Sequence, residues 1–129
     1  MSRLIMEQQQ TAAFERYGAF FAFSDKQLEE KRQEGIKYVS LFSGLIAPKD
    51  NAKRLLEELE AITDNYIKRD IKENGIKKIL WREFANYECQ IVGNPEDAID
   101  ALENYHIDKK TIQEEWANYW NWCVDNDNF

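Results

Sequence analysis

The chain has 129 residues, 43% of them hydrophobic, which is enough material for one hydrophobic core. Only 5 Gly and 2 Pro occur, which excludes collagen-like and turn-dense β architectures, and no apolar run approaches the roughly 20 residues of a membrane span. We therefore predict one domain over residues 1–129. The first residues lack the apolar stretch of a signal peptide, so we expect a cytoplasmic protein with no membrane partner.

Charge is distributed unevenly along the chain. Residues 1–84 hold 14 acidic and 15 basic residues, whereas residues 85–129 hold 10 acidic residues against only Lys109 and Lys110, a net charge of −8. Such an imbalance repels nucleic acids and attracts basic surfaces. One interpretation is a solvated face that aids solubility, and the sharper one is an acidic surface that imitates a phosphate backbone.

The first third of the chain predicts two helices and one β-like segment. Residues 4–17 contain strong helix formers and are followed by Gly18, which readily adopts the left-handed conformation that ends a helix. Ser24 and Gln27 have the spacing of a capping box, which predicts a second helix to about residue 33. Residues 37–47 are rich in β-branched and aromatic residues and predict a short hairpin or an extended loop.

Four more helices are predicted after residue 50. Apolar residues recur at intervals of three and four over residues 50–73 and again over 76–91, with Gly75 between the two helices. Asn94 and Pro95 predict the start of a short helix that ends near residue 104, and Asp108 predicts the N-cap of a last helix that ends near residue 124. We expect residues 125–129 to form a loose tail.

These elements together predict a mainly α fold, with α+β as the alternative. The expected architecture is a compact bundle of about five or six helices with one short β-like segment near residues 37–47. A two-stranded hairpin is marginal by itself, so the β-like segment must pack on helices. The sequence does not indicate an oligomeric state.

Four segments of the chain resemble a family of small proteins from bacteriophages and other mobile elements of bacteria. They are Tyr17–Gln27, Tyr38–Lys49, Arg82–Glu88 and Gly93–Leu102. In relatives the second segment contains a glycine cluster, of which only Gly44 is present here, and the third has a histidine where this chain has Tyr87. The resemblance implies an accessory protein that acts inside a bacterial host cell. It implies no activity and no catalytic residue.

The acidic and aromatic end of the chain is our first candidate for a functional surface. The last helix carries four large aromatics within seven residues, and Trp122 lies away from the stripe that Trp116 and Trp120 define at 100° per residue. Exposed Trp is enriched at the hot spots of protein interfaces, although packing within the protein is the simpler explanation. We predict that the surface binds a host protein with a basic surface, such as a defence nuclease, through Glu115, Trp122, Asp125 and Asp127.

Two alternative sites lie in the middle of the chain. The first is a basic cluster that would bind nucleic acid directly, and it consists of Lys68, Arg69, Lys72, Lys77, Lys78 and Arg82. An ordinary charged helix surface would explain the same cluster. The second is a polar network of Glu83, Asn86 and Glu88, which as a catalytic site would need further ligands or acid–base partners nearby. Direct nucleic-acid binding is the less favoured of the two main hypotheses.

The sequence has no recognisable catalytic or metal-binding motif. His106 is the only histidine, and glycine-rich phosphate loops, GxSxG and HExxH are all absent. We therefore predict no enzymatic activity, no cofactor and no metal site. Cys89 and Cys123 form no CxxC pair, and we expect two buried free thiols in helices.

Overall fold

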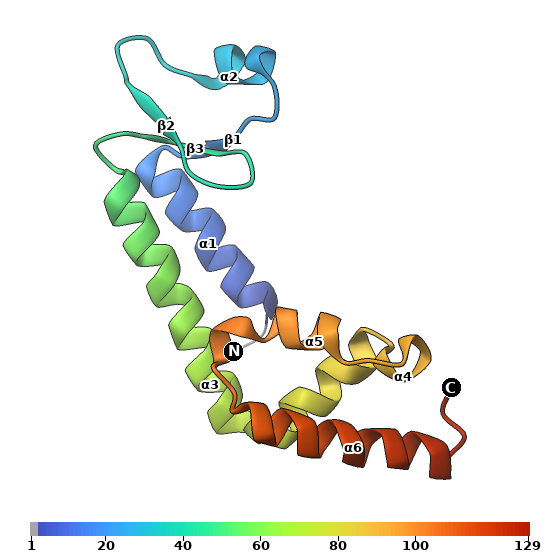
Figure 1. The fold of residues 1–129 in the computed structure, drawn as a ribbon. Coiled ribbons are helices and arrows are strands. Elements are labelled where there is room, and N and C mark those ends of the chain that lie inside the picture. The colour runs from blue at the N-terminus through green and yellow to red at the C-terminus, as the bar shows by residue number, and fades with distance from the viewer. Residues whose placement is uncertain (1–2) are drawn as a thin grey trace. The chain divides into compact units, whose positions relative to one another are not determined.

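The structure, a computed structural model, describes residues 3–129 (Figure 1). This part of the chain contains six α-helices, one 3-10 helix and three short β-strands, so the predicted mainly α fold is confirmed. No helix within residues 3–129 is both long and apolar enough to cross a membrane. The contacts divide the chain into an N-terminal unit, Met1–Tyr66, and a C-terminal unit, Ile67–Phe129. The single domain over 1–129 stays a prediction.

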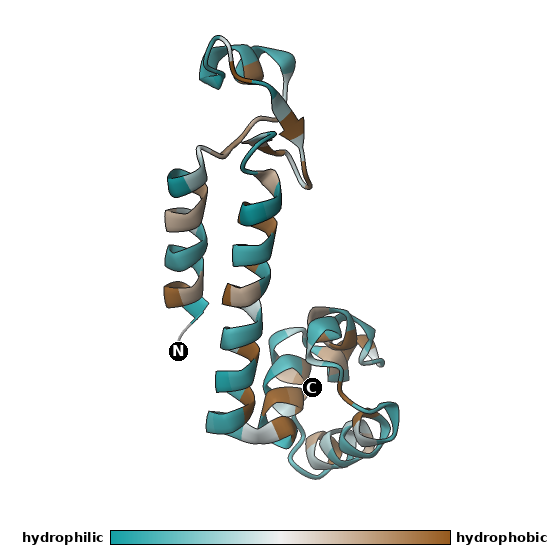
Figure 2. Ribbon diagram, turned by 90° about the vertical axis from the view of Figure 1, so that its left-hand side faces the viewer, coloured by the Kyte–Doolittle hydropathy of each residue, from teal (hydrophilic) through white to brown (hydrophobic). Residues whose placement is uncertain are grey.

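The N-terminal unit combines two helices with a small sheet. Its elements are α1 (Arg3–Tyr17), β1 (Phe20–Phe21), α2 (Asp25–Lys31), β2 (Tyr38–Ser40), β3 (Leu45–Pro48) and the first part of α3 (Ala52–Asn86). In both ribbon views α1 and the first part of α3 lie side by side, with the sheet at one end of the pair (Figures 1 and 2). The helices thus give the sheet the apolar support that a short hairpin lacks by itself.

The sheet has the order β1-β3-β2, and both pairings are antiparallel. The predicted hairpin is present as β2 and β3, in which Val39 lies opposite Ala47. The sequence did not predict β1, where Phe20 lies opposite Ile46, because two residues are too short to show an alternating pattern. The central strand is buried, and its Leu45 and Ala47 form the core of this unit together with Ala13, Leu55 and Leu59.

Helix α2 begins as a capping box predicts. The Ser24 side chain accepts a hydrogen bond from the N–H of Gln27, and the Gln27 side chain accepts one from the N–H of Phe23. The helix ends at Lys31, two residues before the predicted end, because Arg32 is already extended with ψ 148°. Its short length agrees with the absence of buried residues on it, since little tertiary packing supports a longer helix.

The C-terminal unit contains the rest of the helices. Its elements are the second part of α3, α4 (Cys89–Val92), α5 (Glu96–Ala101), the 3-10 helix η1 (Glu103–Tyr105) and α6 (Lys109–Asp125). Gly75 interrupts α3 with φ 77° and ψ 158°, so the predicted break between two helices is present at the predicted residue. Along α3, apolar residues recur between hydrophilic ones, as the periodicity requires (Figure 2).

Two boundaries in this unit differ from the sequence prediction. The helix expected to continue to residue 91 ends at Asn86, because Glu88 adopts the left-handed conformation with φ 51°. This change of direction allows Cys89 to enter the core, where it is 1% exposed. The next helix begins at Glu96, one residue later than predicted, with Pro95 rather than Asn94 at the N-cap, although the Asn94 side chain accepts a hydrogen bond from the N–H of Glu96.

The core of the C-terminal unit is more aromatic than that of the N-terminal unit. It consists of Ile79, Leu80, Phe84, Cys89, Ala98, Leu102, Tyr119 and Cys123. Helix α6 begins after Asp108, as predicted, and supplies two of these residues. The residues after α6, expected to be a loose tail, make specific contacts: the N–H of Asn128 donates to the carbonyl oxygen of Cys123, and the ring of Phe129 packs edge-on against Trp120.

Candidate partner-binding surface

The predicted partner-binding residue Trp122 belongs to a cluster of aromatic rings between α3 and α6. The ring centroid of Trp81 lies 5.2 Å from that of Tyr119 and 6.0 Å from that of Trp122. Trp122 and Tyr119 are stacked at 6.3 Å. One face of Trp122 therefore packs within the protein, yet 44% of the residue remains exposed. Trp122 is thus a partly buried aromatic that is held in place and still accessible to a partner.

Glu115 has a different position from the one its predicted role requires. Its carboxylate accepts hydrogen bonds from the Trp81 indole N–H and from the Asn118 side chain, both at 3.1 Å. The Lys77 ammonium lies 5.3 Å from the centre of the Trp81 ring. Glu115 consequently fixes the indole against which Trp122 packs, and a partner would compete with these bonds for its carboxylate.

Asp125 and Asp127 are both exposed at the end of α6. Asp125 follows Trp122 by three residues, so the two side chains lie on the same side of the helix. Asp127 has φ 50° in the turn that returns the chain toward the helix, a conformation that Asp and Asn tolerate better than most residues. These two acids thus lie close to Trp122 in the chain, whereas Glu115 lies two turns away.

Other large apolar residues of the C-terminal unit are exposed besides Trp122. The C-terminal unit also exposes Ile91, Val92, Val124 and Phe129, each by more than half. Single exposed apolar residues are ordinary, but several large ones on a small unit with excess negative charge are typical of a surface that binds another protein. No short sequence motif indicated Ile91 and Val92 as exposed, and the periodicity had assigned Ile91 to the apolar stripe of a continuous helix.

The basic cluster is largely engaged by neighbouring side chains. Arg69 pairs with Glu73 at 3.4 Å, Lys77 lies over Trp81, and Arg82 takes part in the polar network described next. The remaining residues of the cluster, Lys68, Lys72 and Lys78, are exposed. A nucleic-acid backbone would thus meet three lysines rather than six unengaged cations.

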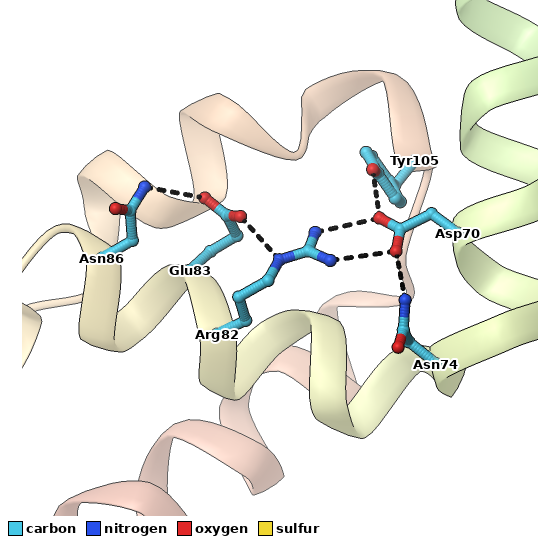
Figure 3. A network of polar contacts seen from close by, with 6 residues as sticks. All are labelled: Asp70, Asn74, Arg82, Glu83, Asn86 and Tyr105. Carbon is cyan, nitrogen blue, oxygen red and sulfur yellow. Dashed lines mark hydrogen bonds and ion pairs between the residues drawn. The ribbon is translucent and has the colours of Figure 1, made fainter. Parts of the chain in front are cut away.

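A polar network connects both sides of the break at Gly75 (Figure 3). Arg82 donates two hydrogen bonds of 2.9 Å to the carboxylate of Asp70, and its third donor reaches Glu83 at 2.9 Å. Asp70 also accepts from the Tyr105 hydroxyl at 2.6 Å and from the Asn74 amide at 2.8 Å. Asp70 is only 5% exposed, so this is a nearly buried charge with four hydrogen bonds.

The network contains two of the three polar residues predicted for it. Asn86 donates to Glu83 at 3.5 Å, and Glu83 in turn binds Arg82. Glu88 instead occupies the left-handed position between α3 and α4. Sequence reasoning missed Asp70 and Tyr105, since Asp70 looked like one more charged residue of a long helix and Tyr105 lies 35 residues away.

The pKa of Asp70 reflects this environment. Burial by itself raises the pKa of the carboxyl, but the hydrogen bonds from Arg82, Tyr105 and Asn74 and the charge of Arg82 outweigh burial and lower the pKa from 3.8 to about 2. The same ion pair raises the pKa of Arg82. Both groups are therefore charged at neutral pH, and the network is better suited to holding helices together than to proton transfer.

The cysteines are free and buried, as predicted. Burial raises the pKa of the Cys89 thiol, so little reactive thiolate forms at neutral pH. Burial, together with Cys123 and Cys89, raises the pKa of Tyr119 to about 12. The Tyr119 hydroxyl donates a hydrogen bond of 3.2 Å to the side-chain oxygen of Gln90. Within residues 3–129 no three His, Cys, Asp or Glu side chains are grouped as metal ligands would be.

The protein is thus mainly α, with an acidic, aromatic C-terminal segment and an ion pair near a helix break in which the carboxylate is nearly buried. A family model matches residues 3–122, and the chain belongs to this family of unknown function, DUF7659. The resemblance to an uncharacterised family is thereby confirmed in its coarser form. Neither a curated protein nor a solved structure matches the chain significantly.

Proposed function

We propose that this protein is an accessory protein of a bacteriophage or another mobile element that binds a host protein through the acidic, aromatic surface of its C-terminal unit. The partner we propose is a protein with a basic, nucleic-acid-binding surface, such as a host defence nuclease. By occupying that surface the protein would exclude nucleic acid without catalysing a reaction. Complementary charge would accelerate association, and the apolar contacts would slow dissociation.

One observation carries this proposal: excess negative charge and exposed large apolar residues occur in the same segment of the C-terminal unit, residues 85–129. Residues 85–129 have a net charge of −8, and within them Trp122 and Val124 are exposed by 44% and 54%. A face that served solubility alone would gain nothing from exposed indole and aliphatic groups. A protein interface uses both, since aromatic side chains provide affinity and charges provide orientation and partner choice.

The alternative is direct nucleic-acid binding through Lys68, Arg69, Lys72, Lys77, Lys78 and Arg82. The bidentate pair of Arg82 with Asp70 disfavours it, because a phosphate would have to compete with a nearly buried carboxylate. The neighbouring residues 85–129 also carry the net charge of −8, which repels a phosphate backbone. We therefore favour the protein-binding proposal.

Affinity capture with a set of matched variants tests this function. Tagged protein is incubated with bacterial host lysate, with and without nuclease treatment, and bound proteins are eluted with added DNA and identified, together with any retained nucleic acid. The test variant combines Asp125→Asn, Asp127→Asn and Trp122→Ala. The control variant, Glu30→Gln with Glu34→Gln, removes two exposed acids from the N-terminal unit instead.

We expect a nuclease-resistant partner that DNA displaces, an affinity at least tenfold lower for the test variant, and no change for the control. A partner that binds wild type and test variant equally would contradict the proposed surface. Retention of nucleic acid, reduced by Lys68→Gln with Lys72→Gln and Lys78→Gln, would instead support the alternative.

A further inference from the structure

A surface groove of about 340 Å³ lies between α6 and the turn that ends α4. It is lined by Gly93, Trp116, Ala117, Trp120 and Asn121. The groove is on the side of α6 away from Trp122, because Trp120 and Trp122 are two residues and thus about 200° apart around the helix. It is therefore separate from the residues that the charge pattern and Trp122 had indicated.

Two indole rings form the walls of the groove. The ring centroids of Trp116 and Trp120 are 5.8 Å apart, and their planes are inclined by 54°. Each indole is also supported from outside: Phe84 packs edge-on against Trp116 at 5.2 Å, and Phe129 packs edge-on against Trp120 at 5.4 Å. The two rings are thus held in fixed orientations by other aromatic residues, as a preorganised binding site requires.

The other lining residues keep the groove open and add a polar group. Gly93 has φ 93°, which favours glycine, and a Cβ atom there would have no neighbour within 4 Å, so this wall lacks any side chain. Ala117 contributes only a methyl group on an exposed turn of α6. Asn121, exposed on the next turn, supplies an amide oxygen that can accept a hydrogen bond.

The charge around the groove is negative. None of the five lining residues is basic, and Glu114 and Asp125 lie on the same helical row as Ala117 and Asn121, although Glu114 also pairs with Lys110 at 4.0 Å. Glu96 and Asp97 are exposed in the first turn of α5, three and four residues after Gly93 in the chain. A cation that approaches the groove is therefore attracted by the excess of acids in residues 85–129, whose net charge is −8.

We propose that this groove binds an arginine side chain from a basic segment of the partner protein, an inference that rests on the proposed protein-binding function. A guanidinium group is planar, is weakly hydrated and stacks on indole faces, whereas the compact lysine ammonium keeps its water more strongly. The walls provide two indole rings, Asn121 provides an acceptor for a guanidinium N–H, and the excess of acids in residues 85–129 compensates the charge. Gly93 leaves the space through which the side chain enters.

Two peptides of equal charge test this inference without the natural partner. Acetylated and amidated hexa-arginine and hexa-lysine are titrated into the full-length protein, and calorimetry gives the dissociation constants. Indole N–H signals in NMR spectra, assigned with single Trp→Phe variants, show which tryptophans respond. We expect hexa-arginine to bind about three to ten times more tightly than hexa-lysine, with shifts at Trp116 and Trp120 larger than those at Trp81 and Trp122.

A substitution that fills the groove makes the test specific. Ala117 is exposed, so Ala117→Gln places a longer neutral side chain in the groove while it keeps a good helix former and leaves the core unchanged. The matched control is Ala101→Gln on an exposed position of α5 outside the groove. We expect Ala117→Gln to abolish the preference for arginine and Ala101→Gln to retain it, with equal thermal melting curves as evidence that both variants fold.

The possible failures separate the two proposals. Equal affinity for the two peptides, or a preference that survives Ala117→Gln, would overturn the arginine site and leave the acidic surface as a general attractor of basic proteins. If neither peptide bound at low salt, both the arginine site and the proposed function would be contradicted, because an acidic surface that attracts basic partners must bind at least one polycation.

Discussion

The two units of this protein differ in what their cores contain and in how they use charge. The N-terminal unit packs small and aliphatic residues such as Ala13, Leu45 and Leu55, and its ion pair between Arg16 and Glu58 lies at the surface. The C-terminal unit packs aromatic residues and includes Asp70, a nearly buried charge. Removal of the Glu58 charge leaves a hydrated arginine, whereas removal of the Asp70 charge weakens four hydrogen bonds to a nearly buried acceptor, so the units should respond very differently to charge removal.

The largest effect in this comparison is expected at Asp70. Asp70→Asn removes the charge that Arg82 pairs with and weakens the acceptor of the Tyr105 hydroxyl, which should lower the free energy of unfolding of the C-terminal unit by about 3 kcal/mol. The matched variant Glu58→Gln removes the acid of the surface pair and should cause no measurable change. Urea denaturation followed by tryptophan fluorescence measures the effect of Asp70→Asn, since all four tryptophans lie in the C-terminal unit, and circular dichroism measures that of Glu58→Gln.

Equal destabilisation by the two substitutions would contradict the distinction between a buried and a surface ion pair. Circular dichroism at 222 nm provides the necessary second signal, because it also reports on the helices of the N-terminal unit. With Asp70→Asn, we expect the fluorescence transition to move to lower urea concentration.

Low pH should reproduce part of the loss of stability that is expected for Asp70→Asn. The pKa of Asp70 is lowered from 3.8 to about 2 in the folded protein, so the group binds fewer protons in the folded than in the unfolded state. Its contribution is therefore present above pH 4 and is lost as the pH falls toward 2, by about 2 kcal/mol in total. Urea denaturation at pH 7, 4 and 2 should show an additional loss in wild type relative to Asp70→Asn, in which position 70 does not titrate.

Parallel loss of stability in wild type and Asp70→Asn between pH 4 and pH 2 would contradict this assignment. The other carboxyl groups titrate in both proteins, so only the difference between the two reports on Asp70. A difference that appears between pH 7 and pH 5 instead would indicate a group other than Asp70.

The comparison also shows what local sequence can reveal. The capping box at Ser24, the break at Gly75 and the N-cap at Asp108 depend on residues within a few positions of one another, and all three were predicted. The network around Asp70 depends on Tyr105, 35 residues away, and on a helix break that brings Arg82 back to Asp70. Periodicity identifies which residues are apolar, but it does not identify which charged residue of a long helix is buried.

The candidate surface shows the same limit of prediction from local sequence. Composition indicated an acidic, aromatic end of the chain, and Trp122 is indeed partly exposed. The groove beside Trp120 depends on Gly93 and on the left-handed residue Glu88, which ends α3 before α4. A continuous helix to residue 91 would place Gly93 elsewhere, so an error of five residues at one helix end was enough to hide this groove.

The smallest effect in the comparison concerns the N-terminal unit, where backbone fit matters more than charge. Gly44 and Gly35 have nearly the same positive φ, 81° and 83°. A Cβ atom at Gly44 would lie 2.5 Å from the Phe23 ring, whereas one at Gly35 would meet nothing within 4 Å. Gly35→Ala should therefore cost about 1 kcal/mol through backbone strain alone, and Gly44→Ala about 2 kcal/mol because Phe23 must also move.

The difference of about 1 kcal/mol between these variants isolates the contact between Phe23 and Gly44 from the cost of the left-handed backbone. Phe23 is largely exposed, so its ring can rotate away, and this limits the penalty. Thermal denaturation by circular dichroism measures both variants in the wild-type and Phe23→Ala backgrounds. We expect the difference to vanish with Phe23→Ala, because the new methyl group then has the same free space at both positions. If the difference persisted without the ring, the fit of the β2–β3 turn would depend on its backbone alone, and the role assigned to Phe23 would be wrong.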